Sequence, residues 1–189
     1  MNTYGQNDIF GYLAYYYREM EVCMYKIGDY LVYKTEGVCK VNKITLMQGA
    51  SDTKKCLYYV LSPIKNDGLT IYSPVDNPTV IRRPVMTAEE ARAVVREAAE
   101  LPPLDVPNEK SREDAYKRAL KSGDCREWFR ITKTIHTRKE YRQQVGKKTT
   151  AMDDHYFRAA QGLLKEELAV ALDLTEQEVD EYIRSHMVS

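Results

Sequence analysis

The residue pattern changes near Pro84, and this change constrains the fold more than any other feature of the chain. Between Met24 and Pro84, short runs rich in Val, Ile, Tyr and Thr alternate with turn-forming segments such as Glu36-Gly37 and Asn66-Asp-Gly68. This pattern predicts about four or five short strands, and no helical period separates them. It therefore favours a small antiparallel barrel over a βαβ unit, and barrels of this kind usually serve as binding modules.

The chain after Pro84 has helical patterns. Thr87-Ala-Glu-Glu90 and Thr175-Glu-Gln-Glu178 both have the spacing of a capping box, so each predicts the start of a helix. Asn108 and Ser122-Gly-Asp124 are further capping signals. The helices expected from these signals and from apolar periodicity cover about 88–100, 109–121, 125–145, 151–172 and the end of the chain. In the last of them, the expected inward side chains are Val179, Tyr182, Ile183 and Met187.

These patterns divide the chain into three parts and place it in the α+β class. Residues 24–85 form the β module, and residues 86–189 form a compact all-α domain of about five helices. The first 23 residues are rich in tyrosine and contain no lysine. We interpret residues 1–23 either as an N-terminal extension or as residues upstream of a true start at Met20 or Met24.

Charge is distributed unevenly, although 28 Lys and Arg exactly balance 28 Asp and Glu over the whole chain. Residues 110–148 carry 13 cationic against 5 acidic residues, whereas residues 149–189 carry 3 against 9. Clustered cations neutralise phosphates, so this block favours DNA binding over an ordinary solvated helix face. The acidic flanks offer the same cations intramolecular partners. No apolar run approaches the roughly 20 residues that span a bilayer, and we expect a cytoplasmic protein without membrane contact.

The sequence offers little support for an enzyme. His136, His155 and His186 have no metal-binding spacing, and neither a nucleophile elbow nor a phosphate-binding loop is present. Asp153-Asp154-His155 are successive on the expected helix, so their side chains cannot converge on one ion. Cys39 and His155 would form a nucleophile and base only if the two domains brought them together. We therefore predict a non-catalytic protein that needs no cofactor.

Cysteine and tryptophan often have functional roles, but here we interpret them as core residues. Cys39 and Cys56 lie in apolar, β-branched surroundings and are not part of a CxxC pair, so we expect small reduced core side chains. Trp128, the only tryptophan, lies beside Phe129 in a helical segment. Its position favours the core over a side chain that inserts between base pairs.

A series of short segments over about residues 24–187 follows the order and spacing of motifs in a known family. It opens with Met24-Tyr-Lys-Ile-Gly-Asp-Tyr-Leu-Val-Tyr33 and Glu36-Gly-Val-Cys-Lys-Val41. The later segments are Tyr58-Tyr-Val-Leu61, Leu69-Thr-Ile-Tyr-Ser-Pro-Val-Asp-Asn77, Arg82-Arg-Pro-Val85, Tyr116-Lys-Arg-Ala-Leu-Lys-Ser-Gly-Asp124 and Leu163-Leu-Lys-Glu-Glu-Leu-Ala-Val-Ala-Leu172. With these segments, the chain resembles the CarD/CdnL family of bacterial transcription regulators.

This resemblance implies a fold and two partners. Residues 24–85 would form a Tudor-like β-barrel that docks on the RNA polymerase β subunit. Residues 86–189 would contact promoter DNA at the upstream edge of the transcription bubble and modulate the stability of the open complex. The DNA contacts expected from the family are Arg112, Lys117 and Lys121. The expected contacts with polymerase are Tyr72, Met47 and Lys43.

The sequence departs from the family pattern at two places. Family members carry a tryptophan that enters the minor groove, and the corresponding stretch here is Leu104-Asp-Val-Pro-Asn108, in which Leu104 is the expected partial substitute. The strand position of a polymerase-contacting arginine falls in Ile71-Tyr72-Ser73, which has no cation. The first departure favours an alternative, a polymerase-binding module that does not touch DNA. A small enzyme is the other alternative, and the residues favour neither activation nor repression.

Overall fold

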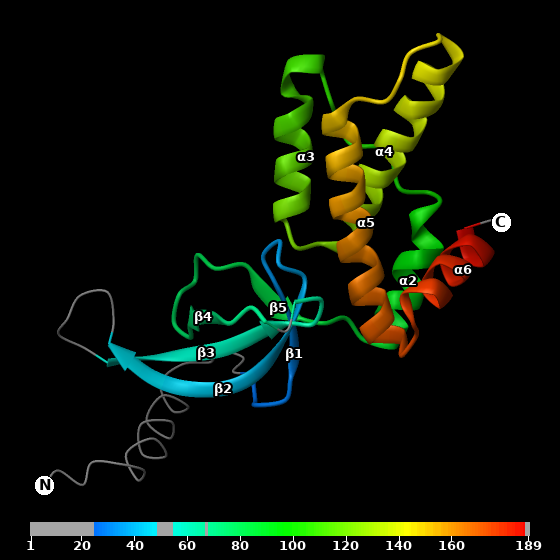
Figure 1. The fold of residues 1–189 in the computed structure, drawn as a ribbon. Helices are drawn as coiled ribbons and strands as arrows, with labels where there is room; N and C mark the ends of the chain where they lie inside the picture. Colours follow the sequence, from blue (N-terminus) through cyan, green and yellow to red (C-terminus); the bar gives the residue numbers. More distant parts are fainter. Residues whose placement is uncertain (1–24, 49–54, 67, 188–189) are drawn as a thin grey trace, which may run out of the picture.

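The computed structural model describes residues 25–48, 55–66 and 68–187, which form one antiparallel sheet followed by helices (Figure 1). The strands are β1 (Tyr30–Tyr33), β2 (Val38–Gln48), β3 (Lys55–Pro63), β4 (Ile71–Pro74) and β5 (Arg82–Pro84). The helices are α2 (Ala88–Ala98), the 3₁₀ helix η1 (Glu109–Ser111), α3 (Arg112–Lys121), α4 (Cys125–Gln144), α5 (Ala151–Leu172) and α6 (Glu176–Met187). The α+β class is confirmed. Residues 1–23, which we interpreted as an extension or as residues upstream of the true start, lie outside the described residues.

The sequence predicted a small antiparallel barrel, whereas the described strands form a sheet that no ladder closes. Its strand order is β4-β3-β2-β1-β5, so β4 and β5 are its edges. Each edge strand is short and contains a proline, which has no N–H to donate to a ladder. In place of a ladder, the Arg82 guanidinium of β5 donates to Ser73 Oγ at 3.1 Å, to the Pro74 carbonyl at 2.6 Å and to the Val75 carbonyl. A single side chain thus spans the gap between the edges.

Two apolar cores build the molecule, and the second joins the sheet to the helices. One face of the sheet buries Leu31, Tyr33, Cys39, Val41, Leu57, Tyr59, Leu61 and Val75. Val32 and Val38 pair across β1 and β2 and belong to the core of the helical domain. Because this core contains both sheet and helix residues, the two parts pack directly against each other and are not merely joined by a linker.

The local signals in the sequence produce the helix boundaries. Both predicted capping boxes are present, at the start of α2 and at the start of α6. Asn108 caps η1, which leads into α3, and Asp124 caps α4. Val179 of α6 is buried, and Tyr182 and Ile183 pack against the helical core as predicted. The structure does not describe the side chain of Met187, so its predicted inward position stays a prediction.

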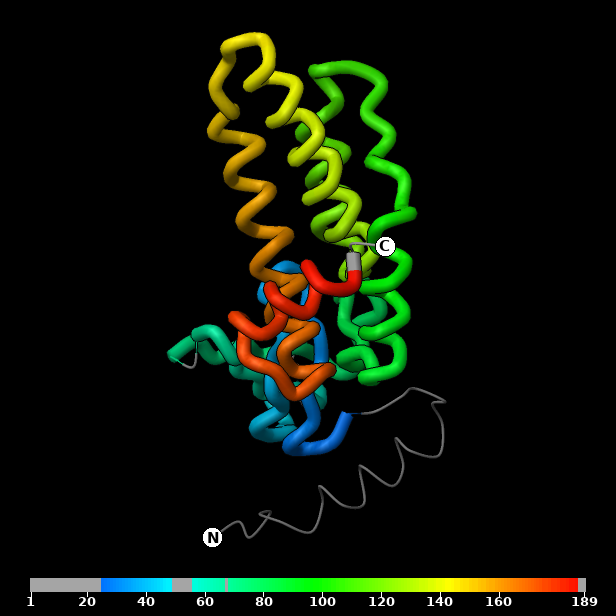
Figure 2. Tube along the Cα trace, turned by 90° about the vertical axis from the view of Figure 1, so that its right-hand side faces the viewer, coloured from blue at the N-terminus to red at the C-terminus, as the bar shows by residue number. Residues whose placement is uncertain are grey.

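The helices lie on one side of the sheet (Figure 1). α3, α4 and α5 run side by side away from it, and α2 and α6 pack near the sheet end (Figures 1 and 2). The turn between α4 and α5 is therefore among the parts of the helical domain farthest from the sheet in both views. Trp128 lies inside this domain, fully buried, and its Nε1 donates to the Leu120 carbonyl at 3.1 Å. Its prediction as a core residue is confirmed.

Candidate docking face and nucleic-acid interface

The three expected polymerase contacts share one face of the sheet. Lys43 of β2 lies opposite Val60 of β3, and Val60 lies opposite Tyr72 of β4, so these residues form one row across three strands. Met47 follows Lys43 by four residues on the same strand, and alternate side chains of a strand point to the same face. The structure therefore brings Lys43, Met47 and Tyr72 together.

We call this surface the outer strip. It consists of Lys43, Met47, Tyr58, Val60 and Tyr72, with Tyr58 paired opposite Pro74 in the row after Val60. Tyr72 is 52% exposed and Met47 is 36% exposed, while Lys43 is also on the surface. An apolar strip with a cation beside it has the composition of a protein-docking surface.

The edge of β4 adds backbone groups to the outer strip. The Val75 N–H donates to the Leu57 carbonyl at 2.9 Å, so this pair is a hydrogen-bonded pair of the antiparallel ladder. Such pairs alternate with non-hydrogen-bonded pairs, and Tyr72 opposite Val60 is one of the latter. The N–H and C=O of Tyr72 consequently point away from β3, where an extended segment of a partner can pair with them.

The four expected DNA contacts do not form one surface. Lys117 and Lys121 lie one turn apart on the outer face of α3, and Lys117 pairs with Glu113 at 3.0 Å. Arg112 faces the inside of the helical domain and is buried. Leu104 is half-buried against the helical core, and its N–H donates to Thr134 Oγ1 at 2.8 Å. Only the two lysines present their charge to solvent.

Arg112 is held in a network of ion pairs around a buried carboxylate. Its guanidinium contacts Glu109, and its Nε lies 3.5 Å from Asp153 Oδ1. Asp153 also accepts hydrogen bonds from Thr150 Oγ1 at 2.7 Å and from Arg138 Nε at 3.2 Å. Burial, together with this carboxylate, raises the pKa of the adjacent Tyr116 to about 12. The network ties η1, α3, α4 and α5 together, so the geometry gives Arg112 a structural role.

The residues considered for catalysis are not assembled into a site. Cys39 is fully buried in the sheet, and burial, followed by the negative charge of Glu166, raises the pKa of its thiol to about 12. His155 is exposed near the start of α5, at the end of the helical domain far from the sheet (Figure 1). Cys56 is half-buried and not a core residue, since it lies near the start of β3. Within the described residues, no group of His, Cys, Asp and Glu side chains has the geometry of a metal site.

Two glutamates of α5 join the domains, and the sequence patterns did not single them out. Glu167 is completely buried and forms a bidentate ion pair with Arg83 of β5, with Oε2 accepting from Nη2 at 2.7 Å. Arg83 Nε also donates to the Gly123 carbonyl at 2.5 Å. The sequence does contain a signal for the burial of Glu167. This residue follows Leu163 by four positions and therefore lies on the apolar face of the helix.

Glu166 makes the second junction. Its Oε1 accepts a hydrogen bond of 2.8 Å from the Val38 N–H of β2. Burial raises the pKa of this carboxyl from 4.5 to about 7, although the Val38 N–H and Lys65 act in the opposite direction. Gly37 has a φ of +81°, and a Cβ atom there would lie 2.5 Å from Glu166 Oε2. Glycine at this left-handed position therefore leaves room for the Glu166 carboxylate beside the start of β2.

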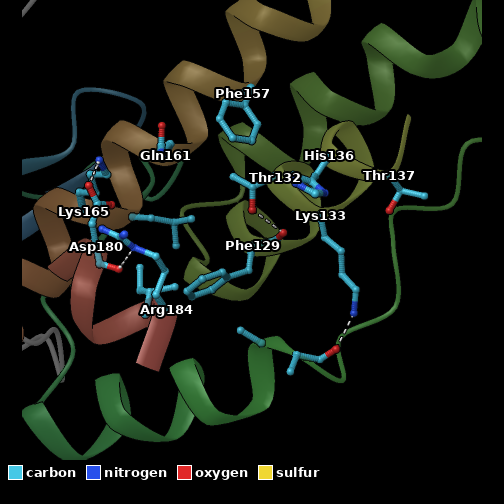
Figure 3. Close-up of a pocket in the computed structure, with 14 residues that line it drawn as sticks. Phe129, Thr132, Lys133, His136, Thr137, Phe157, Gln161, Lys165, Asp180 and Arg184 are labelled. Carbon is cyan, nitrogen blue, oxygen red and sulfur yellow. Dashed lines mark hydrogen bonds and ion pairs between the residues drawn. The ribbon is translucent and has the colours of Figure 1, made fainter. Parts of the chain in front are cut away.

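A cavity of about 790 Å³ opens between α2, α4, α5 and α6 (Figure 3). Phe129 of α4 and Phe157 of α5 contribute apolar walls. Lys133 extends to the end of α2, where its Nζ donates to the carbonyls of Ala99 and Leu101 at 2.6 and 2.7 Å. Lys165 pairs with Asp180 at 2.6 Å. Because these charged groups already stabilise the fold, the cavity does not present a converging reactive set.

The β module matches a known domain family. Residues 25–85 match the model of the CarD-like/TRCF RID domain. The chain carries a CarD-like/TRCF RID domain. A comparison with curated proteins finds no match.

The RID match confirms the resemblance to CarD-like proteins for the sheet and its flanking loops. The RID domain family is a family of non-catalytic interaction domains, and the match indicates an interaction of this domain with RNA polymerase in transcription. The match ends at Val85, immediately before α2. No helix within the described residues is long and apolar enough to cross a membrane.

Proposed function

We propose that this protein is a CarD-like transcription regulator. Its Tudor-like RID domain docks on the RNA polymerase β subunit through the outer strip and the adjoining edge of β4. Its helical domain then contacts promoter DNA near the upstream edge of the transcription bubble and modulates the stability of the open complex. The observation that carries this proposal is the row Lys43–Val60–Tyr72, which lies within the RID match beside an open strand edge.

The outer strip supports docking by its chemistry. Tyr72 offers a large ring at low entropic cost, and its outward backbone groups add hydrogen bonds that do not depend on sequence. Met47 supplies an adaptable apolar contact, and Lys43 supplies a charge that selects an acidic partner surface. Together these features satisfy a protein partner without requiring a cation in the stretch Ile71-Tyr72-Ser73.

The junction between the domains supports action on DNA bound to the same polymerase. A protein that docks on one partner can position a second surface only if the two surfaces are rigidly connected. Val32, Val38, Arg83 and the two buried glutamates provide this connection. The fixed geometry would hold the helical domain, and with it Lys117 and Lys121, at a constant place relative to the docked sheet.

A polymerase-binding module without DNA contact is the alternative function. Leu104 favours it, because this residue is half-buried against the helical core, whereas the corresponding tryptophan of the family enters the minor groove. The inward orientation of Arg112 also removes one expected phosphate contact. DNA binding by the whole protein decides between the two functions.

The first experiment measures capture of purified polymerase β subunit by the full chain. Tyr72→Ala should lower the affinity about tenfold, because exposed aromatic residues dominate docking energetics. Tyr72→Phe is the matched control, since it keeps the exposed ring and removes only the hydroxyl, and it should bind the β subunit within about twofold of the wild type. Failure of the wild-type chain to capture the β subunit would refute the polymerase assignment.

The second experiment titrates the full chain with a forked promoter fragment over a range of salt concentrations. Salt-sensitive binding supports the regulator that touches DNA. Capture of the β subunit without DNA binding would instead establish the interaction module. Lys117→Gln combined with Lys121→Gln should flatten the salt dependence, since both side chains are exposed on α3.

A further inference from the structure

Five of the 13 cations of the basic block 110–148 form ion pairs within the helical domain. Arg126 pairs with Glu97 at 2.8 Å, and Arg130 pairs with Glu127 at 2.6 Å. Arg112 and Arg138 share Glu109 and Asp153. These pairs remove much of the positive charge that the sequence places in this block.

Uncompensated positive charge remains at one end of the domain, which we call the α4 tip. It comprises residues 139–150, the last turns of α4 and the turn into α5, and it lies far from the sheet (Figures 1 and 2). Its cations are Lys139, Arg142, Lys147 and Lys148, against the single carboxylate of Glu140. In the part of the chain that the structure describes, none of these cations makes an ion pair.

The backbone gathers the cations of the α4 tip. Gly146 has a φ of +69°, a left-handed conformation that reverses the chain at the end of α4. The Lys147 N–H then donates to the Arg142 carbonyl at 2.8 Å, and Arg142 Nε donates to the Lys148 carbonyl at 2.8 Å. Lys147 and Lys148 are therefore held next to Arg142.

Two apolar side chains are exposed among these cations. Tyr141 is 65% exposed and Val145 is 47% exposed. They are four residues apart, so they lie on the same face of α4. Exposed aromatic and aliphatic groups surrounded by unpaired cations are the combination that binds nucleic acid, with the cations on phosphates and the apolar groups against sugars and bases.

We propose that the α4 tip is a DNA-contacting surface, in which Tyr141 and Val145 lie in a groove while Lys139, Arg142, Lys147 and Lys148 contact the flanking phosphates. This inference rests on the DNA-binding part of the proposed function and adds a second contact surface to that of Lys117 and Lys121. Duplex DNA is the occupant because its regularly spaced phosphates complement several cations held close together.

The charge part of the inference is tested by DNA titration of the full chain at several salt concentrations. Lys147→Gln combined with Lys148→Gln should reduce the slope of log affinity against log salt by about two units. Arg92→Gln combined with Arg96→Gln on exposed positions of α2 makes the same charge change near the sheet end and should leave the slope unchanged. Equal slopes for the wild-type chain and the lysine variant would overturn the inference.

The contact by the ring is tested separately from the charge. Tyr141→Ala should weaken DNA binding about tenfold, whereas Tyr141→Phe keeps the ring and should bind within about twofold of the wild type. Unchanged binding by Tyr141→Ala would overturn the contact. Thermal unfolding of each variant confirms that folding is retained, as expected for so exposed a side chain.

The outcomes separate this inference from the proposed function. If the wild-type chain does not bind DNA, the DNA part of the proposed function fails, and the α4 tip fails with it. If the wild-type chain binds DNA and the tip variants bind equally well, only the tip assignment fails. If the tip variants lose capture of the β subunit but keep DNA binding, the tip is a protein contact and the inference is wrong.

Discussion

Glu166 of α5 accepts a 2.8 Å hydrogen bond from the backbone N–H of Val38, a residue of β2 that lies 128 positions earlier in the chain. The bond crosses between the RID domain and the helical domain, and both residues are buried. Its neighbour Glu167 pairs with Arg83 in the same interface. A pair of carboxylates in successive positions of one helix therefore holds the two domains together.

Glu166→Gln should change the pH dependence of stability. Burial raises the pKa of Glu166 from 4.5 to about 7, so between these pH values the unfolded chain loses the proton while the folded chain retains it. Rising pH consequently destabilises the folded state across this window, by up to about 3 kcal/mol. Glutamine keeps the acceptor for Val38 and removes the titration. The variant should gain stability relative to the wild type as the pH rises from 4.5 to 7.

Urea unfolding at several pH values measures this effect. Glu181→Gln, an exposed position of α6, serves as the control and should leave the pH dependence unchanged. We expect the difference in free energy of unfolding between Glu166→Gln and the wild type to be constant below pH 4.5 and again above pH 7. A difference that does not vary with pH would contradict a protonated Glu166 in the folded protein.

Arg83→Met should destabilise the protein strongly. It leaves Glu167 buried without its cation, a change that costs about 3–5 kcal/mol when a buried pair loses one partner. Arg83→Met combined with Glu167→Leu should recover part of the loss, because neither charge then remains in the interface. A double-mutant cycle by urea unfolding measures the coupling. Additive effects of the two substitutions would show that the pair does not stabilise the interface.

The sequence predicted those features that depend on neighbouring residues. Capping boxes, the cap at Asp124 and the apolar period of α5 require only a few adjacent positions, and the structure has each of them where it was expected. The pattern of short strands and turns in the first domain also depends only on neighbouring residues. The pairing partners of the strands could not be predicted from neighbouring residues. The gap between the edge strands β4 and β5, which Arg82 spans and which we call the seam, arises because both edges contain proline and form no ladder with each other.

The candidate surfaces could be predicted only in part, because they depend on which charged side chains the fold pairs with opposite charges. Lys43 and Tyr72 were predicted individually, and their common row follows from strand register, including an irregularity between Val41 and Lys43. Arg112 was grouped with Lys117 because the family resemblance places both residues on or near the helix that faces DNA. The structure separates them because Arg112 faces the buried Asp153, while Lys117 faces solvent.

Arg82→Met should loosen the seam between the sheet edges. The guanidinium donates to Ser73, Pro74 and Val75, so its removal leaves a buried hydroxyl and two carbonyls without this donor. Such losses cost about 1–3 kcal/mol. Hydrogen exchange should accelerate over residues 71–75 and remain unchanged in α4, which does not depend on the seam. Uniform acceleration across both domains would indicate global destabilisation and contradict a local role.

Arg112→Gln should reduce stability without changing how DNA binding depends on salt. Its guanidinium neutralises Glu109 and Asp153 inside the helical domain, so the substitution removes a structural contact and should lower the free energy of unfolding by about 2 kcal/mol.

The contrasting variant is Lys117→Gln combined with Lys121→Gln, which should retain stability and reduce the salt slope by about two units. Urea unfolding and DNA titration of both proteins, with affinities compared under conditions where each is folded, make the distinction. A flattened salt slope with full stability in Arg112→Gln would show instead that Arg112 leaves its carboxylate partners to bind phosphate, as the family resemblance implies.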